Sequence, residues 1–206
     1  MKTLAPLPLI LAGLLLAACG NLLPGSEPAP DLYTLSPATR FADGLVQVPW
    51  QLGIEEPSAV GGLDSNRIAV MSTPNEVKYF AEVRWVERTP RMVQGLIVES
   101  FERSRAVGGV DRSAIGMRSD YVLRSELRDF QAELFDASKT PTVHVRLTAK
   151  LVRSGRHEVV WSRDFEARAP ARTTSARDVV AAFDEALGRA MADLVVVTLR
   201  DTPPPR

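Results

Sequence analysis

The sequence is poor in the residues that most often carry enzyme chemistry. It has one cysteine and two histidines in 206 residues, so no internal disulfide can form and stability must come from packing. Neither His144 nor His157 has a cysteine or a second histidine at ligand spacing, which argues against a zinc site. P-loop, G-x-G-x-x-G and G-x-S-x-G motifs are absent. We therefore predict no catalytic residues, no metal site and no cofactor.

An excess of charge of one sign is also missing. The chain has 25 basic and 25 acidic residues, and they alternate instead of forming long runs. A nucleic-acid-binding protein would carry a basic excess or a basic stripe. The composition therefore argues against nucleic acid as a partner, and most charged residues are predicted to be solvated.

Long apolar runs are lacking after residue 18, but residues 4–18 form one, preceded by Lys2. A positive start, an apolar core and small residues are the parts of an export signal. The alternative is a transmembrane anchor. Residues 4–18 are too short for the roughly 20 residues that span a bilayer, and Pro6 and Pro8 would disturb such a helix. We therefore expect residues 1–18 to be a signal peptide.

Cys19 follows Leu16, Ala17 and Ala18 directly. An ordinary secretory signal would leave this cysteine alone at the mature N-terminus, without a disulfide partner. The pattern instead resembles the lipobox of bacterial lipoproteins. That resemblance implies cleavage before Cys19 and acylation of its thiol and amino group, and several acyl chains give stable anchoring. Gly20, in place of the aspartate that commonly retains lipoproteins in the inner membrane, implies the periplasmic face of the outer membrane.

The mature chain begins and ends with segments that lack apolar periodicity. Residues 19–30 are rich in proline and glycine and are expected to be a flexible tether, which reaches on the order of 20 Å as a random coil. Residues 31–200 are long enough for one domain with its own core. The proline-rich residues 201–206 are expected to be a disordered tail.

The first half of the domain contains strand patterns and one helix. Strands are expected at residues 31–35, 44–55 and 67–71, with Pro49 marking a sheet edge or a bulge. A helix is expected from Thr89, as its capping residue, to about residue 105, before the glycines at 108 and 109.

Residues 120–136 fit two kinds of element. Leu123, Leu127, Phe130 and Leu134 recur at helical spacing, whereas a strand would need a bulge near residues 128–129. The resemblance described below favours the strand.

Two clean strands and a helix complete the domain. Residues 143–151 and 159–167 alternate apolar and polar around a turn at 154–156, which predicts a β-hairpin. This loop would place Arg146 opposite Asp164 and His144 opposite Glu166. Ser175 is expected to cap a helix that runs to about residue 199. The fold class is therefore α+β: a single domain with a mostly antiparallel twisted sheet and two main helices on one face.

Several phrases, taken in order, resemble the ABC-type transport auxiliary lipoprotein family, also called the PqiC-like family. They lie at residues 32–35, 66–70, 79–90, 119–130, 165–170 and 180–187. Their order and spacing carry the resemblance, which covers nearly the whole mature chain. It implies that residues 120–136 form a long strand.

The resemblance also implies a function. Members of this family accompany transporters that move lipids, such as phospholipids, across the Gram-negative envelope. The implied partners are a periplasmic protein with mammalian-cell-entry (MCE) domains and an ABC permease with its ATPase, and the chain could also form a homo-oligomer. Two rivals stay open: a domain that itself carries an acyl chain, and an envelope-structural lipoprotein.

Arg84 and Trp85 lie in one of these phrases and are candidates for partner binding, because arginine and tryptophan are frequent in hot spots. The alternative is that Trp85 packs against the helix that begins at Thr89. Trp50 and Trp161 are expected in the core.

Overall fold

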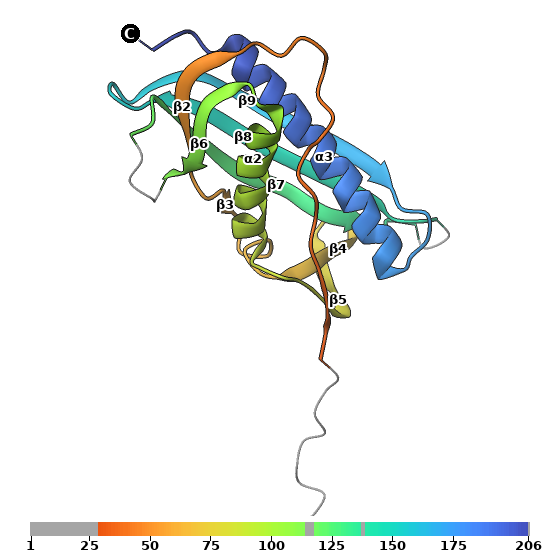
Figure 1. The fold of residues 1–206 in the computed structure, drawn as a ribbon. Helices are drawn as coiled ribbons and strands as arrows, with labels where there is room; N and C mark the ends of the chain where they lie inside the picture. Colours follow the sequence, from red (N-terminus) through yellow and green to blue (C-terminus); the bar gives the residue numbers. More distant parts are fainter. Residues whose placement is uncertain (1–28, 114–117, 137–138, 206) are drawn as a thin grey trace, which may run out of the picture.

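A computed structural model of the chain describes residues 29–113, 118–136 and 139–205. These residues form a nine-stranded mixed sheet and two helices, α2 (Thr89–Ser104) and α3 (Ala176–Asp201). Both helices pack on the same face of the sheet (Figure 1). The longest strand pairings are antiparallel. The predicted α+β architecture is therefore confirmed.

The strands differ widely in length, and the three longest follow one another in the second half of the chain. In order they are β1 (Asp31–Tyr33), β2 (Val48–Ile54), β3 (Ser58–Ala59), β4 (Arg67–Thr73), β5 (Glu76–Trp85), β6 (Val107–Arg112), β7 (Tyr121–Glu133), β8 (Thr142–Arg153) and β9 (Glu158–Pro170).

Strand β7 organises the sheet. One edge pairs along its whole length with β8, antiparallel, and β8 pairs in turn with β9. The other edge is shared by β2, β3 and β4, which pair with successive parts of β7 in the parallel direction. The register of β7 shifts between Leu127 and Asp129. The ambiguous segment is therefore a strand with a bulge at the predicted place, and the bulge keeps its apolar residues on the core side.

The β8–β9 hairpin has the predicted faces but not the predicted partners. Arg146 lies opposite Glu166, and Thr148 lies opposite Asp164, so the expected Arg146–Asp164 and His144–Glu166 cross-strand pairings are wrong. The turn has four residues, 154–157, instead of the predicted three. A bulge in β9 follows, because Val152 pairs with Val159 but Leu151 pairs with Trp161. Each change alone would reverse the faces of β9, and together they restore them.

The two helices begin differently. Ser175 Oγ accepts a hydrogen bond from the Asp178 amide at 3.3 Å, as predicted. Helix α2 instead follows Arg88, with no side-chain cap. The Thr89 hydroxyl donates to the Ser65 carbonyl at 2.9 Å, so its expected capping role is wrong: it ties the helix to the preceding loop.

Proline 49 marks a bulge, not an edge, because β2 lies between β6 and β7. Opposite it, a Cβ added to Gly108 would stand 2.3 Å from the Pro49 carbonyl oxygen. Any larger residue would require the backbone to shift, and this close approach explains why a glycine stands at position 108 inside β6.

The core between sheet and helices is filled by large aromatic side chains. Trp85, Phe130 and Phe183 meet with ring centroids 4.9 to 6.1 Å apart, and Trp50 packs edge-on against Tyr121. Trp50 and Trp161 are buried, as expected. These rings, together with the buried aliphatic side chains of the core, remove apolar surface from water and so stabilise the domain.

The two ends of the described chain lie at opposite ends of the molecule (Figure 1). At the C-terminal end, Thr202 is buried, and its hydroxyl accepts a hydrogen bond from Trp161 Nε1 at 3.3 Å. The Tyr121 hydroxyl donates to the Pro203 carbonyl at 2.6 Å. Residues 201–203 are therefore packed against the sheet, and the expectation of a disordered tail does not hold for them.

The segment after β1 crosses the helices before it enters the sheet at β2. The amide of Ser36 donates to Asp184 at 2.6 Å, and the amide of Ala38 donates to Ser100 Oγ at 2.9 Å. Leu35 and Ala38, which belong to this segment, are buried. The expected signal peptide, Cys19 and most of the expected tether lie outside the described residues.

Candidate functional site

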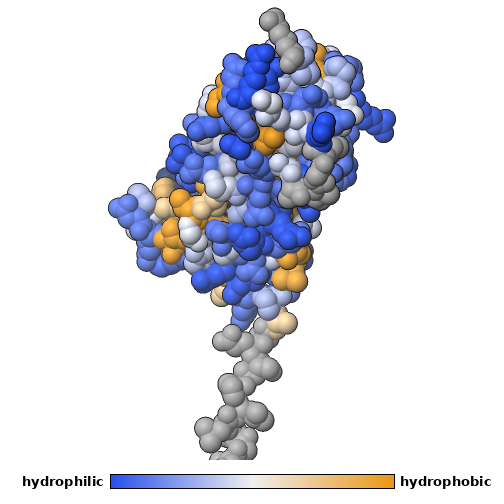
Figure 2. Space-filling model, turned by 90° about the vertical axis from the view of Figure 1, so that its left-hand side faces the viewer, coloured by the Kyte–Doolittle hydropathy of each residue, from blue (hydrophilic) through white to orange (hydrophobic). Residues whose placement is uncertain are grey.

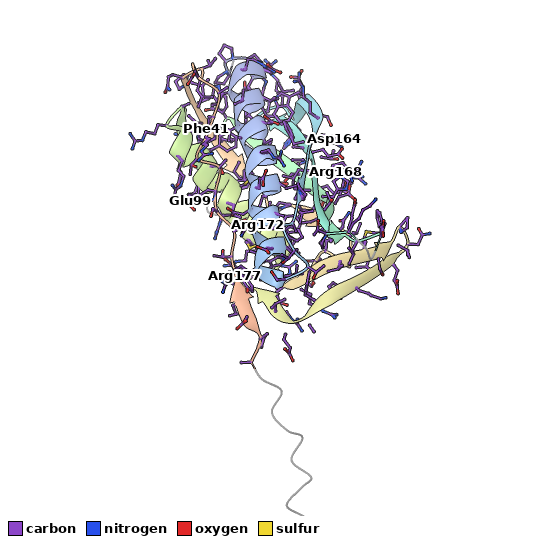
Figure 3. The ribbon with its side chains drawn as sticks, turned by 90° about the vertical axis from the view of Figure 1, so that its right-hand side faces the viewer. Phe41, Glu99, Asp164, Arg168, Arg172 and Arg177 are labelled. Carbon is purple, nitrogen blue, oxygen red and sulfur yellow. The ribbon has the colours of Figure 1, made fainter. Side chains whose placement is uncertain are left out.

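Helices cover one face of β7, β8 and β9, and the other face carries polar side chains. Figure 3 places Glu99 of α2 on the helix side and Asp164 and Arg168 of β9 on the other side. We call seven residues of this second face the open-face cluster: Asp129, Gln131, Glu133, His144, Arg146, Glu166 and Arg168.

His144 lies at the centre of the open-face cluster and is only 6% exposed. Its Nδ1 is 2.9 Å from Glu133 Oε1, and its Nε2 is 2.8 Å from Glu166 Oε1. The guanidinium of Arg168 lies 3.0 Å from Nδ1 and donates to Glu133 Oε2 at 2.8 Å. The imidazole, which β8 supplies, is therefore held by groups on both neighbouring strands, β7 and β9.

Asp129 and Arg146 form an ion pair in the same cluster. They are cross-strand partners in the β7–β8 register, and Arg146 Nε donates to Asp129 Oδ2 at 2.6 Å. Gln131 Nε2 donates to Asp129 Oδ1 at 3.1 Å. Burial raises the pKa of Asp129, but the hydrogen bonds from Gln131 and Arg146 outweigh it, so this pKa lies below its ordinary value.

The hairpin between β4 and β5 projects beyond this face and bounds a groove of about 380 Å³ over the cluster. Met71, Pro74 and Phe135 supply its apolar wall. Every charged group in the cluster has an opposite charge within ion-pairing distance. No group of three potential ligands with metal-binding geometry occurs among the described residues. The face thus presents a fixed charge pattern suited to recognition.

The structure separates the two residues predicted to bind a partner. Trp85 is 1% exposed and packs against Phe130 and Phe183, so its ring is not available to a partner. Arg84 points to the other side of β5, where its Nη1 donates to the carbonyls of Val83 and Phe80.

Two further grooves on the described surface have charged residues in their walls. One of about 590 Å³ lies between the crossing segment and the helices, with charged walls from Arg40, Arg103, Asp184, Glu185 and Arg189. Another, of about 360 Å³, lies on the open face and includes Arg124, Glu126, Arg128 and Lys150. Both grooves are open to solvent, whereas an acyl chain requires an enclosed and mostly apolar pocket.

Sequence reasoning missed the open-face cluster as a unit. The alternation of apolar and polar residues does predict part of the cluster, because it places His144 and Glu166 on the polar face of the hairpin. Asp129 and Glu133 join them only because the β7 bulge changes which residues of that strand face outward.

Neither described helix is long and apolar enough to cross a membrane.

Comparison with known proteins identifies relatives of this chain. The family model for the ABC-type transport auxiliary lipoprotein component matches residues 33–195. A crystal structure from Xanthomonas campestris, protein XCC0632 of family DUF330, shares 32% identity with a TM-score of 0.77. It covers 82% of this chain and 95% of its own.

Two further relatives are more distant. A solved structure of an uncharacterized protein, at 14% identity and a TM-score of 0.64, covers 81% of this chain and 97% of its own and shares the fold. An uncharacterized protein of Bradyrhizobium diazoefficiens is 26% identical over 183 residues. These residues are 88% of this chain, but the chain spans only about half of that relative, 48% of its length.

Proposed function

Because the chain belongs to the family of ABC-type transport auxiliary lipoprotein components, we propose that it is a non-enzymatic component of an envelope phospholipid transport system. In this proposal, acyl chains on Cys19 hold the domain at the periplasmic face of the outer membrane. The domain docks onto an MCE-domain periplasmic protein that works with an ABC permease and its ATPase.

The observation that favours docking over lipid carriage is the filled core. A carrier needs a dry apolar cavity large enough for an acyl chain. Here the space between sheet and helices is occupied by Trp85, Phe130 and Phe183, and the grooves described above have charged walls. A filled core with a patterned surface suits a protein that binds another protein.

The open-face cluster is the docking surface in this proposal. The opposite face of β8 and β9 is covered by α3, whereas the open face carries charges already held in place by ion pairs. Fixed, complementary charges set the orientation and specificity of an interface more than its affinity. A membrane tether raises the local concentration of the domain, so a modest affinity is sufficient.

The test is to purify the tagged full-length chain from envelope extracts and to identify co-purified proteins and lipids by mass spectrometry. We expect an MCE-domain protein in the wild-type sample. Arg168→Glu, which reverses a charge in the cluster, should lower its recovery roughly tenfold, equivalent to about 1.4 kcal/mol. Arg103→Glu on α2 is the matched control, because the two arginine side chains are 50% and 49% exposed and both are ion-paired.

Other outcomes identify the rivals. Stoichiometric phospholipid without an MCE-domain protein would favour a lipid carrier. Recovery of neither, together with an intact barrier to detergents in a strain lacking the gene, would favour an envelope-structural lipoprotein.

A further inference from the structure

The end of the domain from which the tether leaves carries an unusual surface on β1, β5 and β4. Strand β1 pairs with β5 in the parallel direction, with Leu32 beside Arg84 and Tyr33 beside Trp85. The Val86 amide extends this ladder by donating to the Tyr33 carbonyl at 2.9 Å. Because side chains alternate along a strand, Leu32, Arg84 and Val86 face away from the core that holds Trp85.

Two of these side chains are large, apolar and exposed. Leu32 is 61% exposed and Val86 is 47% exposed. Single exposed apolar residues are ordinary. Here, however, both lie beside Arg84: Leu32 is its partner on β1, and Val86 follows it two residues later, just after the end of β5. Figure 2 shows hydrophobic colour beside the point where the N-terminal chain leaves the body.

The same surface brings two arginines together. Arg67 on β4 is the direct cross-strand partner of Arg84 on β5, an arrangement of like charges that is unfavourable by itself. Neither guanidinium has a carboxylate within 4.0 Å among the described residues. Arg67 instead lies over the Tyr79 ring, 3.6 Å from its centroid.

Neighbouring acidic residues do not form ion pairs with these two arginines. Asp31, Glu82 and Glu87 are the acidic residues closest to Arg84 and Leu32 along β1 and β5. Glu87 is ion-paired with Arg91, and no ion pair joins Asp31 or Glu82 to either arginine within the described part of the chain. Arg67 and Arg84 therefore present two guanidinium groups without an ion-paired carboxylate beside two apolar side chains. We call Leu32, Arg67, Arg84 and Val86 the tether-end patch.

The position of the patch indicates what it meets. The described chain begins at residue 29, two residues before β1, and β1 lies at this end of the molecule (Figure 1). If Cys19 is acylated, as the proposed function requires, the 12 residues from Cys19 to Pro30 span roughly 20 Å as a random coil. The tether-end patch is then the surface of the domain nearest to the anchoring bilayer.

We propose that the tether-end patch rests on the headgroup region of the membrane that holds the anchor. Apolar side chains that enter the interface together with basic residues that meet lipid phosphates are the two elements of peripheral membrane binding. Phosphates would also relieve the repulsion between Arg67 and Arg84. This contact orients the domain, with the β8–β9 turn and the C-terminal end farthest from the bilayer.

The experiment is photocrosslinking of the full-length chain in the envelope of expressing cells. p-Benzoylphenylalanine replaces Leu32 in one sample and Val159 in another, because Val159 is 53% exposed and lies at the start of β9, near the far end. We expect at least roughly five times more phospholipid adduct at position 32 than at 159. Arg67→Gln together with Arg84→Gln should lower the adduct at position 32 more than roughly tenfold, because each basic residue near an anionic surface contributes about 1 kcal/mol and about 1.4 kcal/mol corresponds to a factor of ten.

A protein adduct at position 32, equal lipid adducts at both positions, or none, would overturn the membrane contact. The intact mass of the same samples reports acylation of Cys19 separately. An acylated chain without the adduct refutes only the patch, whereas a non-acylated chain with the adduct refutes only the anchor.

Discussion

At the scale of single residues, the half-buried carboxylate Asp129 links the open-face cluster to stability. Burial alone would raise its pKa, but donors on Gln131 and Arg146 lower it below the ordinary 3.8. A carboxyl whose pKa is lower in the folded state stabilises the fold above its unfolded pKa. That contribution is lost as the pH falls through the folded pKa.

We therefore expect Asp129→Asn to lower the free energy of unfolding at neutral pH by about 1–3 kcal/mol, because it leaves Arg146 without its charged partner. The difference from wild type should shrink well below pH 3.8, where the wild-type carboxyl is protonated. Urea denaturation at both pH values measures it. Asp193→Asn, on the exposed side of α3, is the control, and an equal loss at both pH values would contradict the pKa argument.

Arg84 and Trp85 show what a residue-level motif can and cannot predict. Both types are enriched in hot spots, but adjacent residues of a regular strand face opposite ways. One of the pair had to face the core, and the larger apolar ring did so. Arg84 stays a predicted binding residue, now for a lipid phosphate in place of the protein partner first expected.

At the scale of elements, alternation predicted the faces of β8 and β9 but not their register. Faces follow from period two, which sequence displays directly. Partners depend on the number of turn residues and on bulges, and His157 adopts a positive φ of 52° that lengthens the turn by one residue. Histidine is, with asparagine and aspartate, one of the non-glycine residues enriched at positive φ, but this preference is too weak to predict the length of the turn.

The C-terminal segment provides a test at this scale. A chain ending at Asp201 loses the hydrogen bonds that Thr202 and Pro203 make with Trp161 and Tyr121. We expect its free energy of unfolding to fall by about 1–3 kcal/mol, because two side chains at the sheet lose buried partners. Urea denaturation followed by tryptophan fluorescence measures the loss. A chain ending at Pro203 keeps both contacts and should match wild type, and equal stability of the two truncations would contradict the packing described here.

At the scale of the molecule, the arrangement around β7 could not be predicted from sequence. Local patterns indicated β2 and β4, but three strands share one edge of β7 through parallel pairings. Parallel partners lie far apart in the chain and leave no turn signal between them. The strand and helix patterns predict the α+β class and the family resemblance predicts the β7 strand, while the open-face cluster needed the three-dimensional register.

The proposed membrane anchor belongs to the scale of the whole chain, because it depends on Cys19, which lies outside the described residues. Cys19→Ser should give a chain without acyl groups, either unprocessed in the inner membrane or released as a soluble form. Intact-mass spectrometry of the purified protein measures this. A wild-type N-terminus without acyl groups would refute the lipoprotein assignment of Cys19.

Destination is tested by the companion change Gly20→Asp, which keeps the acylated cysteine and alters only the residue after it. If the resemblance to sorted bacterial lipoproteins holds, this variant should move from the outer to the inner membrane in a density-gradient separation. Asn21→Asp is the matched control, because it adds the same charge one position later. A wild-type chain found in the inner membrane would contradict the outer-membrane proposal. The tether-end patch would still face a bilayer there, since its position depends on the tether and not on which membrane holds it.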